Sequence, residues 1–425
     1  MLDIKFIREN KDVIEAGAKK KHIPFNVHEL ISVDDQRLVA LQAFEALRAE
    51  QNQMSDKISA EKDALVRTQM IEAMRVVKED LKTKEEQLRE VLKRWQELML
   101  QVPNVPDITV PEGESDEQNI EVRVWGTKTS FDFKPKDHVE ILESLDLADF
   151  ERGTKVAGFR GYFMKNEGAE LFFALWQFTL NYFIKEGYTP MIVPSLVKKE
   201  ALYGTGYLPQ GEEDLYKTQD SEYLAGTGEV ATMFYHSDEI LDKADLPKKI
   251  IAFSPCFRRE AGAHGKDVKG IIRVHEFFKL EQVILCEASH EVSVQFHEDI
   301  TRHVENIMQQ LGLPYHVVVN CGGDLGLGQV KKYDIEAWMP SQEKYRETHS
   351  SSYFHDFQTR RLNIRYRDDE GKLRYVHSLN NTACATSRLP AAILENYQQA
   401  DGSIKIPEVL VPYMGGKTHI TFKNK

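Results

Sequence analysis

Apolar and polar positions follow different patterns in the first hundred residues and in the rest of the chain. From about Asp34 to residue 65, and from about residue 70 to residue 101, apolar side chains recur three or four positions apart in densely charged sequence. This spacing predicts two long amphipathic helices, the second ended by Pro103. We expect them to form an antiparallel hairpin joined near residues 66–70, although an oligomerising coiled coil fits the same pattern.

Residues 103–120 mark a domain boundary by their composition. Proline occurs three times within them, followed by acidic and small residues, which is typical of a linker. We therefore expect a helical domain over residues 1–102 and a second domain over residues 121–425 that is large enough for its own core. In that second domain, residues 168–186 are strongly apolar and predict a helix buried in the core or at a subunit interface.

Residues 257–281 carry the strongest candidate chemistry. A buried-looking strand, IIAFSPCF, leads into them, a polar segment with three glycines follows, and an apolar strand then resumes. If these segments form a hairpin, Arg258 and Glu260 point to one side, because strand residues two apart share a face. The returning strand places three more side chains on one face: Arg273, Phe277 and Glu281. A solvated face with incidental charge pairing remains the alternative.

Composition and charge argue against several classes of function. The 425 residues carry a formal net charge of −12, which argues against coating nucleic acid by bulk electrostatics but leaves room for a local basic track. The four cysteines form neither a C-x-x-C pair nor a zinc-ligand spacing, so we expect reduced, packed thiols in a cytosolic protein. The amino terminus has no export pattern, and no apolar run approaches the roughly 18 residues of a membrane span, so we expect no membrane partner.

The pattern F-R-x-E, loop, R-x-x-x-F-x-x-x-E over residues 257–281 resembles motif 2 of the class II aminoacyl-tRNA synthetases, and in detail that of the seryl-tRNA synthetases. GYTPMIVPSLV (187–197) resembles motif 1, and HSLNNTACATSRLPAAILENYQ (377–398) resembles motif 3. T-G-E (227–229) and E-T-H-S (347–350) resemble two further signatures of that family. The resemblance implies an α+β fold, with a class II catalytic domain built on an antiparallel β-sheet flanked by helices, after an N-terminal antiparallel α-helical coiled-coil hairpin.

The resemblance also implies which side chains do the chemistry. The implied catalytic residues are Arg258, Glu260 and Arg388. The residues implied to bind ATP are Arg258, Arg259, Glu260, Arg273, Val274, Phe277, Glu347, Thr348, His349, Ser350 and Arg388. Those implied to bind serine are Thr227, Gly228, Glu229, Arg258, Glu281 and Thr382. Glu347 and Ser350 would hold the Mg²⁺ that accompanies ATP, since oxygen ligands suit that cation. His349 stands where the family usually has a serine.

Three loops carry weaker signals. The loop of the motif 2 hairpin holds His264, Lys266 and Lys269, and we expect it to close on ATP or on the acceptor end of tRNA. CGGDLGLGQ (321–329) lacks the G-K-[ST] and the strand–turn–helix context of phosphate-binding loops, so we interpret it as a structural turn. Residues 201–218 are loop-rich and, in the family, help to cover the site.

The activity that the resemblance implies is serine–tRNA ligation in two steps, through seryl-adenylate and with release of pyrophosphate. Its partners would be ATP, serine and tRNA(Ser), with tRNA(Sec) as a second candidate acceptor. Motif 1 implies a homodimer, in which the arm contacts tRNA bound across the dimer. Two other classes stay open: an adenylating relative that loads a carrier protein, which would lack the long arm, and a non-catalytic RNA-binding or regulatory paralogue with the same fold.

Overall fold

The computed structural model describes residues 1–263, 265 and 267–422. The chain divides into two compact units, one of residues 1–19 and 23–103 and one of residues 20–22 and 104–425. None of the described helices combines the length and the apolar character needed to cross a membrane. His264 and Lys266, two of the three loop residues expected to act on ATP or tRNA, lie outside the described residues.

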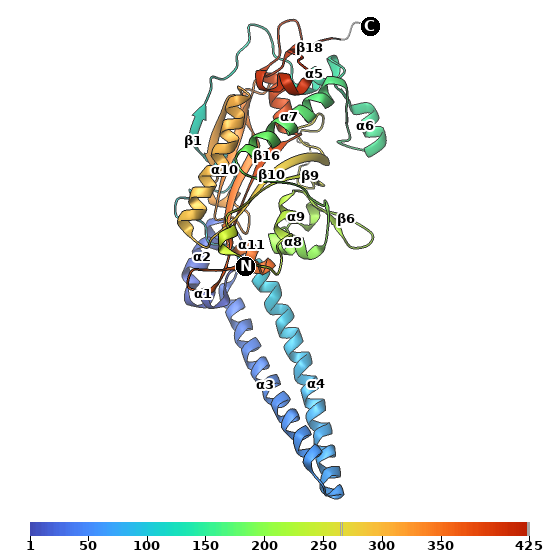
Figure 1. Cartoon of the computed structure of the whole chain (residues 1–425), viewed down its shortest axis with the longest axis vertical. Coiled ribbons are helices and arrows are strands. Elements are labelled where there is room, and N and C mark those ends of the chain that lie inside the picture. The colour runs from blue at the N-terminus through green and yellow to red at the C-terminus, as the bar shows by residue number, and fades with distance from the viewer. Residues whose placement is uncertain (264, 266, 423–425) are drawn as a thin grey trace. The chain divides into compact units, whose positions relative to one another are not determined.

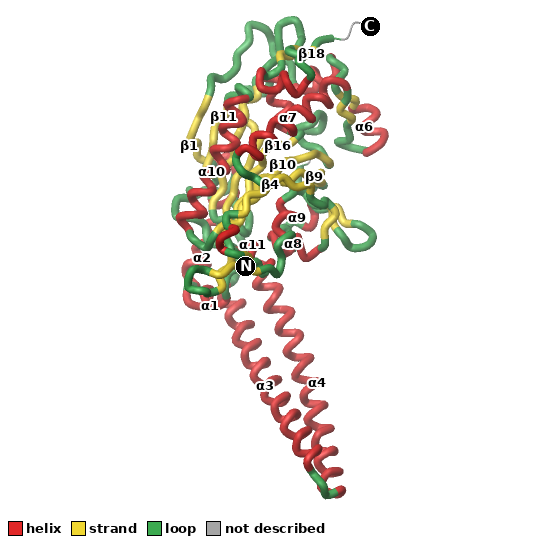
Figure 2. The backbone as a smooth tube through the Cα atoms, viewed as in Figure 1, coloured by secondary structure: helices red, strands yellow, loops and turns green. Residues whose placement is uncertain are grey.

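Two long helices dominate the first unit (Figures 1 and 2). Its helices are α1 (Ile4–Glu9), α2 (Lys11–Lys20), α3 (Val27–Ala60) and α4 (Ala64–Gln101). Along the seam between α3 and α4, α4 buries Met74 and Leu88, and the Arg37 Cζ atom lies 4.9 Å from the ring centroid of Trp95. The predicted antiparallel helical hairpin is confirmed.

The turn between α3 and α4 lies at residues 61–63, earlier in the chain than the predicted 66–70. Asp63 begins α4, because its carboxylate accepts hydrogen bonds from the backbone N–H groups of Leu65 and Val66 at 2.8 and 3.2 Å. Such a cap satisfies donors that have no partner in the first helical turn. The apolar pattern places the turn too late in the chain because it counts Leu65 as a core position of the first helix. The Leu65 side chain is in fact 79% exposed.

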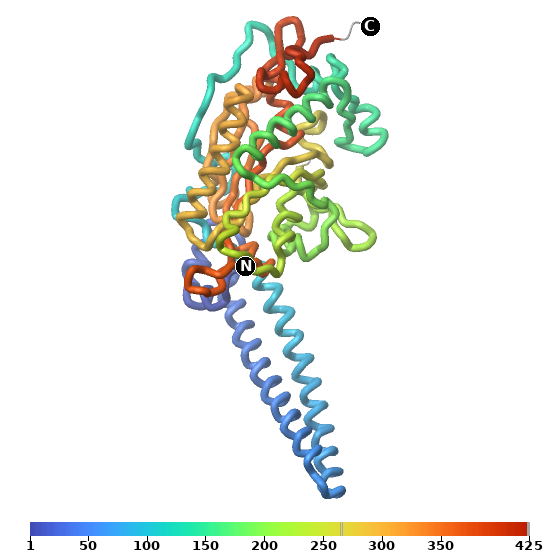
Figure 3. The backbone as a smooth tube through the Cα atoms, in the orientation of Figure 1, coloured from blue at the N-terminus to red at the C-terminus, as the bar shows by residue number. Residues whose placement is uncertain are grey.

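An eight-stranded sheet forms the centre of the second unit (Figure 2), in the order β1-β11-β12-β13-β16-β10-β9-β4. Neighbouring strands pair antiparallel except β4 and β9, which are parallel. The strands are β1 (Ile120–Trp125), β4 (Thr189–Ile192), β9 (Lys248–Phe257), β10 (Glu276–Cys286), β11 (Tyr315–Val319), β12 (Lys331–Met339), β13 (Lys344–His355) and β16 (His377–Ala385). Figure 3 shows how this sheet joins segments from distant parts of the chain. The predicted α+β class with an antiparallel sheet is confirmed.

Helices and short strands surround this sheet. The helices are α5 (His138–Ser144), α6 (Phe150–Ala157), α7 (Asn166–Lys185), α8 (Lys199–Thr205), α9 (Glu229–Phe234), α10 (His290–Gln310), α11 (Phe357–Leu362) and α12 (Arg388–Asn396). The short strands are β2 (Ala148–Asp149), β3 (Phe163–Met164), β5 (Leu196–Val197), β6 (Tyr216–Lys217), β7 (Tyr223–Leu224), β8 (Ile240–Leu241), β14 (Arg365–Arg367), β15 (Leu373–Tyr375), β17 (Ile404–Lys405) and β18 (His419–Ile420). α8 occupies the start of a stretch that was expected to be loop-rich.

The two faces of the sheet have different surroundings. Gln282 of β10 and Asn381 of β16 donate hydrogen bonds to the Ile300 carbonyl oxygen of α10, at 3.3 and 2.8 Å. Successive strand residues point to opposite faces, so Glu281 and Thr382, which pair across β10 and β16, point away from α10. The face opposite α10 is therefore the one that can present polar side chains to a substrate.

The hairpin of residues 257–281 forms, but its strands are shorter than predicted. β9 ends at Phe257 and β10 begins at Glu276, so Arg258, Glu260 and Arg273 lie in the connecting loop. The predicted strand geometry at Arg258 and Glu260 is therefore wrong, although both side chains line the same cavity. Glu260 has φ +55°, a left-handed backbone conformation that a regular strand does not contain.

Candidate active site

A polar cavity of about 230 Å³ opens on the sheet face opposite α10. The side chains at its centre come from the segment before α9, from α9 itself, from β10 and from β16: Thr227, Glu229, Lys279, Glu281 and Thr382. Glu229 and Glu281 are each 3% exposed. Two buried carboxylates at one cavity suit a cationic ligand, since a buried charge needs an opposite charge or hydrogen-bond donors.

Glu229 is held on both of its oxygen atoms. The Tyr207 hydroxyl donates to Oε2 at 2.9 Å, and Gln358 Nε2 of α11 donates to Oε1 at 2.6 Å. Burial raises the pKa of Glu229, and the charge of Glu281 raises it further, while these hydrogen bonds oppose the shift. Tyr207 follows the left-handed Gly206 (φ +91°) that ends α8, so this turn places the hydroxyl at the carboxylate.

A second, smaller cavity of about 50 Å³ shares four residues with the first: Arg258, Lys279, Glu347 and Thr382. It is lined further by Glu260, Arg273, Val274, Phe277, Thr348 and Arg388. The shared residues make the two cavities adjoining parts of one cleft. A cleft with carboxylates in one part and arginines in the next can hold an ammonium group and a polyphosphate side by side.

Two arginines of the second cavity, Arg273 and Arg388, are paired with acids from the same cleft. Arg273 Nη1 donates to Glu260 Oε2 at 2.6 Å. Arg388 Nη1 lies 3.1 Å from Glu347 Oε2 and donates to the Glu347 carbonyl oxygen at 2.9 Å. The loop residues therefore meet through ion pairs, although strand alternation does not bring them together.

Arg258 lies beside the aromatic side chain of the cleft. Its guanidinium carbon is 5.4 Å from the ring centroid of Phe277, and its Nε donates to the Gly226 carbonyl oxygen at 3.3 Å. Phe277 is on β10 and is 7% exposed. An aromatic face with a cation above it is a suitable stacking place for a purine.

A β-bulge brings Glu347 and Ser350 to the same cleft. Regular alternation would point residues three apart to opposite faces. In β13, Glu347 pairs with Glu336 and His349 pairs with Ile335, so Thr348 is an extra residue without a partner in this ladder. Because of this extra residue, the side chains of Glu347 and Ser350 point to the same face of the sheet, and both line the first cavity.

The donors at this bulge fit a magnesium ion. Burial alone would raise the pKa of Glu347, but Arg388 and Lys332 outweigh it and lower that pKa to about 2, so the carboxylate is ionised at neutral pH. In the described part of the chain, no three His, Cys, Asp or Glu side chains are grouped as a metal site. One carboxylate and one hydroxyl still suit Mg²⁺, because this ion commonly keeps several waters and binds through few protein groups plus substrate phosphates.

Not every residue predicted from the sequence reaches the cleft. His349 is fully buried on the other side of β13, where its Nδ1 lies 2.8 Å from Thr348 Oγ1, and burial lowers its pKa to about 3. Among the residues described as lining the two cavities, neither Arg259 nor Gly228 appears. Lys269 pairs instead with Glu143 of α5 at 2.7 Å.

The sequence patterns do not mark several residues of the cleft. Lys279 and Tyr207 line the first cavity, and Lys279 could have been found because it stands two positions before Glu281 on the same strand face. The turn at 326–329, expected to be structural only, also lines this cavity. Lys21, which belongs to the second unit, donates to the carbonyl oxygens of Gly326, Leu327 and Gln329 at 2.6–3.0 Å.

A sheet of this topology with these adjoining cavities is the catalytic core of a class II aminoacyl-tRNA synthetase. Residues 214–397 match the family described as "tRNA synthetase class II core domain (G, H, P, S and T)", and residues 1–106 match "Seryl-tRNA synthetase N-terminal domain". The chain belongs to the seryl-tRNA synthetase family.

Similar proteins agree with this assignment over the whole chain. The chain is 43% identical to the serine–tRNA ligase of Deinococcus radiodurans, covering 98% of each protein. It is 44% identical to that of Trichlorobacter lovleyi, covering 99% of this chain and all of the relative. Among solved structures, seryl-tRNA synthetase from Pyrococcus horikoshii with ATP superposes with a TM-score of 0.89 at 38% identity, covering all of both chains. The serine–tRNA ligase of Naegleria fowleri with AMP gives 0.86 at 32% identity, over 100% of this chain and 99% of that one.

Proposed function

We propose that this chain is a serine–tRNA ligase. It activates L-serine with ATP to seryl-adenylate and pyrophosphate, and then transfers the seryl group to the 3′ end of tRNA(Ser), with release of AMP. The observation that carries this proposal is the pair of adjoining cavities, one with buried carboxylates and one with arginines, joined at Arg258. The relatives named above, similar over their full length, support it.

The first cavity would bind serine. Glu229 and Thr227 would hold its ammonium group, and Glu281 and Thr382 would contact its hydroxyl. A site built to hydrogen-bond a substrate hydroxyl can reject an analogue without one by about 10⁴–10⁵, because its buried polar groups would lose their partners. This arrangement explains how a small pocket could select serine over alanine.

The second cavity would bind ATP. Phe277 and Arg388 would sandwich the adenine, Glu260 would accept from its amino group, and Arg258 would hold the α-phosphate. The serine carboxylate attacks the α-phosphorus, the bond to the bridging oxygen breaks, and pyrophosphate leaves. The protein acts by aligning the two substrates and by balancing the charge that develops on the phosphate oxygens.

Glu347 and Ser350 would hold Mg²⁺. The bound ion would supply charge neutralisation for the phosphates of ATP. Glu347 is suited to this task because its carboxylate remains ionised at neutral pH, and Ser350 adds a neutral oxygen on the same side of the sheet.

The three parts of the chain would have separate tasks. Residues 1–102 would bind tRNA through the helical arm, residues 103–120 would link the parts, and residues 121–425 would carry out the chemistry. RNA read through shape and backbone needs only a local stripe of cations, which Lys82, Lys84 and Lys93 of α4 can supply. The carrier-protein alternative does not explain the long arm.

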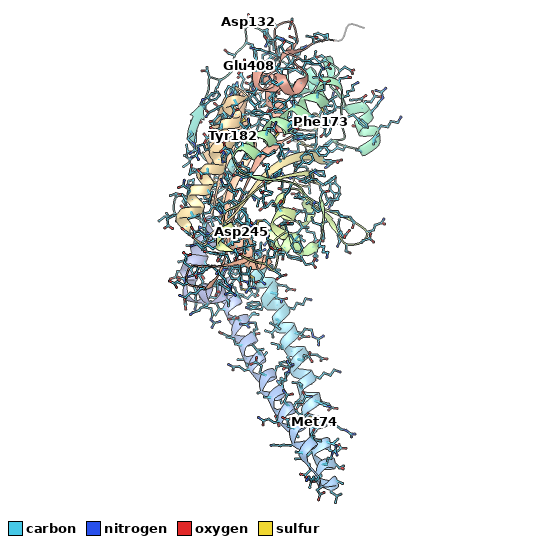
Figure 4. The ribbon with its side chains drawn as sticks, viewed as in Figure 1. Met74, Asp132, Phe173, Tyr182, Asp245 and Glu408 are labelled. Carbon is cyan, nitrogen blue, oxygen red and sulfur yellow. The ribbon has the colours of Figure 1, made fainter. Side chains whose placement is uncertain are left out.

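A second copy of the chain would cover an apolar face of the second unit. A groove of about 780 Å³ is lined mainly by apolar and aromatic side chains, and Phe159, Phe163 and Phe173 there are 55%, 45% and 66% exposed. Figure 4 labels Phe173, which belongs to α7. Exposed apolar patches of this kind mark association surfaces. The edge strand β4, within the motif 1 segment, also fits a subunit boundary.

The four cysteines are free and buried, as predicted from their spacing. Free thiols suit a reducing compartment, which supports a cytoplasmic location for the enzyme.

Charging of purified tRNA with labelled serine tests the proposed function. We expect seryl-tRNA from tRNA(Ser), serine-dependent ATP–pyrophosphate exchange, and a fall in both of at least about 10²-fold for Arg258→Ala, because a charge-stabilising donor is lost. The matched control is Arg302→Ala, which removes an exposed ion pair with Asp299 on α10 and should leave both reactions near normal. Normal exchange by a folded Arg258→Ala protein would contradict the assignment of this arginine.

A further inference from the structure

The floor of the amino-acid cavity contains a buried ammonium group to which the proposed chemistry gives no task. Lys279 of β10 is 5% exposed. Its Nζ lies 2.5 Å from Glu281 Oε2 and donates to Thr227 Oγ1 at 2.8 Å. A lysine this deeply buried is rare unless it is paired. Lys279 therefore contacts two of the residues expected to contact serine.

The charges of this floor balance in a specific way. Glu229 and Glu281 bring two negative charges and Lys279 brings one positive charge, so the floor has a net charge of −1 when all three are ionised. Arg258 adds a positive charge where the two cavities join. This layout matches a free amino acid, whose ammonium group carries +1 and whose carboxylate carries −1.

Without Lys279 the two glutamates would form a like-charge pair. Burial and the charge of Glu281 already raise the pKa of Glu229, and Lys279 opposes that shift. Without that cation, Glu229 would keep a proton to higher pH, because a second carboxylate in a buried site raises the pKa of the first. A carboxyl group that carries this proton is no longer an anionic acceptor.

We propose that Lys279 is a positioning residue that sets the charge of the serine pocket. It pairs with the carboxylate of Glu281, which would accept from the substrate hydroxyl, and leaves the floor with the single negative charge that a substrate ammonium group neutralises. This inference rests on the proposed function and extends it to a residue that the family signatures of this chain do not include.

Lys279→Met tests the proposal by steady-state ATP–pyrophosphate exchange. The expected result is a fall in kcat/KM for serine of about 10²-fold, because Glu229 and Glu281 would be left without a cation in the cavity that binds the amino acid. KM for ATP should change less than about threefold. Between pH 6 and 9, kcat/KM for serine should rise with pH in the variant more steeply than in the parent, because the pKa of Glu229 is higher without Lys279 and its proton leaves as pH increases. A loss of packing alone would not add this pH dependence.

The double variant Lys279→Met/Glu281→Gln removes both members of the pair and restores the net charge of −1 through Glu229. It should fold even where the single variant does not, since the one buried charge that remains, on Glu229, accepts hydrogen bonds from Tyr207 and Gln358. It should lose the added pH dependence and regain part of the serine activity. Its preference for serine over alanine should stay at least about tenfold below that of the parent, because a neutral amide replaces the anionic acceptor.

Two results would overturn the proposal. One is a Lys279→Met enzyme with the serine kinetics and pH profile of the parent. The other is a double variant that is less active than the single variant at every pH, since charge compensation then has no effect. A parent enzyme that activates a different amino acid would contradict the proposed function instead, and the same variants would test the charge balance with that substrate, which has the same ammonium group.

Discussion

At the scale of one residue, neighbouring cations keep the carboxylate of Glu347 ionised. Its folded pKa of about 2 lies below the ordinary glutamate value of about 4.3, mainly because Arg388 and Lys332 outweigh its burial. A depressed folded pKa stabilises the protein at pH values above the unfolded pKa, and this contribution is lost as pH falls through the folded value. The Glu347–Arg388 pair therefore contributes to stability at neutral pH and loses that contribution between about pH 4.3 and pH 2.

Glu347→Gln should thus lower the melting temperature most above about pH 5 and have a shrinking effect as the pH approaches 2. Differential scanning calorimetry of parent and variant from pH 7 to pH 2.5 measures this difference. As a control, Glu72→Gln removes an exposed pair with Arg75 on α4 and should have little effect at any of these pH values. A difference for Glu347→Gln that does not change with pH would contradict the assigned pKa.

Individual site residues could be predicted where a family signature includes them. They could be predicted less well where an irregularity of the backbone determines which way a side chain points. The bulge at Thr348 brings Glu347 and Ser350 to the same cleft. No residue type in E-T-H-S predicts a bulge at this position. The same bulge leaves His349 in the core, so its position in the signature did not give its surroundings. Lys279 follows from strand alternation once Glu281 is placed, but the signature does not mark it.

At the scale of elements, the motif 2 loop joins the two cavities to the surface. Arg258, Glu260 and Arg273 lie at its two ends, and Lys269 extends to Glu143. Because the sequence places Lys266 and Lys269 in the loop between Arg258 and Arg273, we predict that Lys266→Ala/Lys269→Ala lowers transfer to tRNA about tenfold while serine-dependent exchange changes less than about threefold. Single-turnover transfer from preformed adenylate measures the first quantity.

The matched control for this loop is Lys198→Ala/Lys405→Ala, two exposed lysines of the same unit. It should leave transfer and exchange unchanged. Equal losses in both steps for Lys266→Ala/Lys269→Ala would leave the loop without a role in tRNA transfer.

The helical arm has its own prediction. Lys82 and Lys93 are exposed on α4, and reversing both charges should weaken contacts with the RNA backbone. Lys82→Glu/Lys93→Glu should raise KM for tRNA about tenfold and reduce its salt dependence, with serine-dependent exchange unchanged. Lys198→Glu/Lys405→Glu is the control for charge reversal alone. An unchanged KM for tRNA would remove these lysines from the proposed tRNA surface.

Elements were predicted well where apolar spacing is long and regular, as in α3, α4 and α7. Their ends were predicted less well. The turn at residues 61–63 depends on the cap at Asp63, and exposed Leu65 concealed it in the apolar pattern. The loop of residues 258–275 is longer than predicted. Residues 271–275 were predicted to begin the returning strand because they include apolar residues, but β10 begins only at Glu276.

At the scale of the whole molecule, the groove that contains Phe173 is the proposed contact with a second copy of the chain. Three phenylalanine side chains there, Phe159, Phe163 and Phe173, remain open to solvent in one copy of the chain. We predict that Phe173→Glu shifts the particle from about twice the 48.9 kDa chain mass toward one chain mass and reduces exchange activity, because a charge would be buried at the interface.

Light scattering at several protein concentrations measures that mass. Phe422→Glu, at another exposed aromatic residue outside the groove, is the control and should leave the mass unchanged. A parent protein that is monomeric at every concentration would count against both the groove and the motif 1 assignment.

The order of the segments along the whole chain was the most predictable property. Arm, linker and three motifs occur in the family's order, and the class of fold followed from them. The pairing of β10 with β16, which places Glu281 opposite Thr382, depends on contacts about one hundred residues apart along the chain. Spacing within a motif does not contain that information.

Amino-acid-dependent ATP–pyrophosphate exchange by the purified chain tests the central claim most directly. Each of the twenty amino acids is supplied in turn, with ATP, Mg²⁺ and labelled pyrophosphate, and formation of labelled ATP is measured. The proposed pocket predicts strong exchange with serine and at least about 10³-fold weaker exchange with alanine, which lacks the hydroxyl. Exchange that prefers another amino acid, or no exchange with any of them, would contradict the proposal that this cleft activates serine.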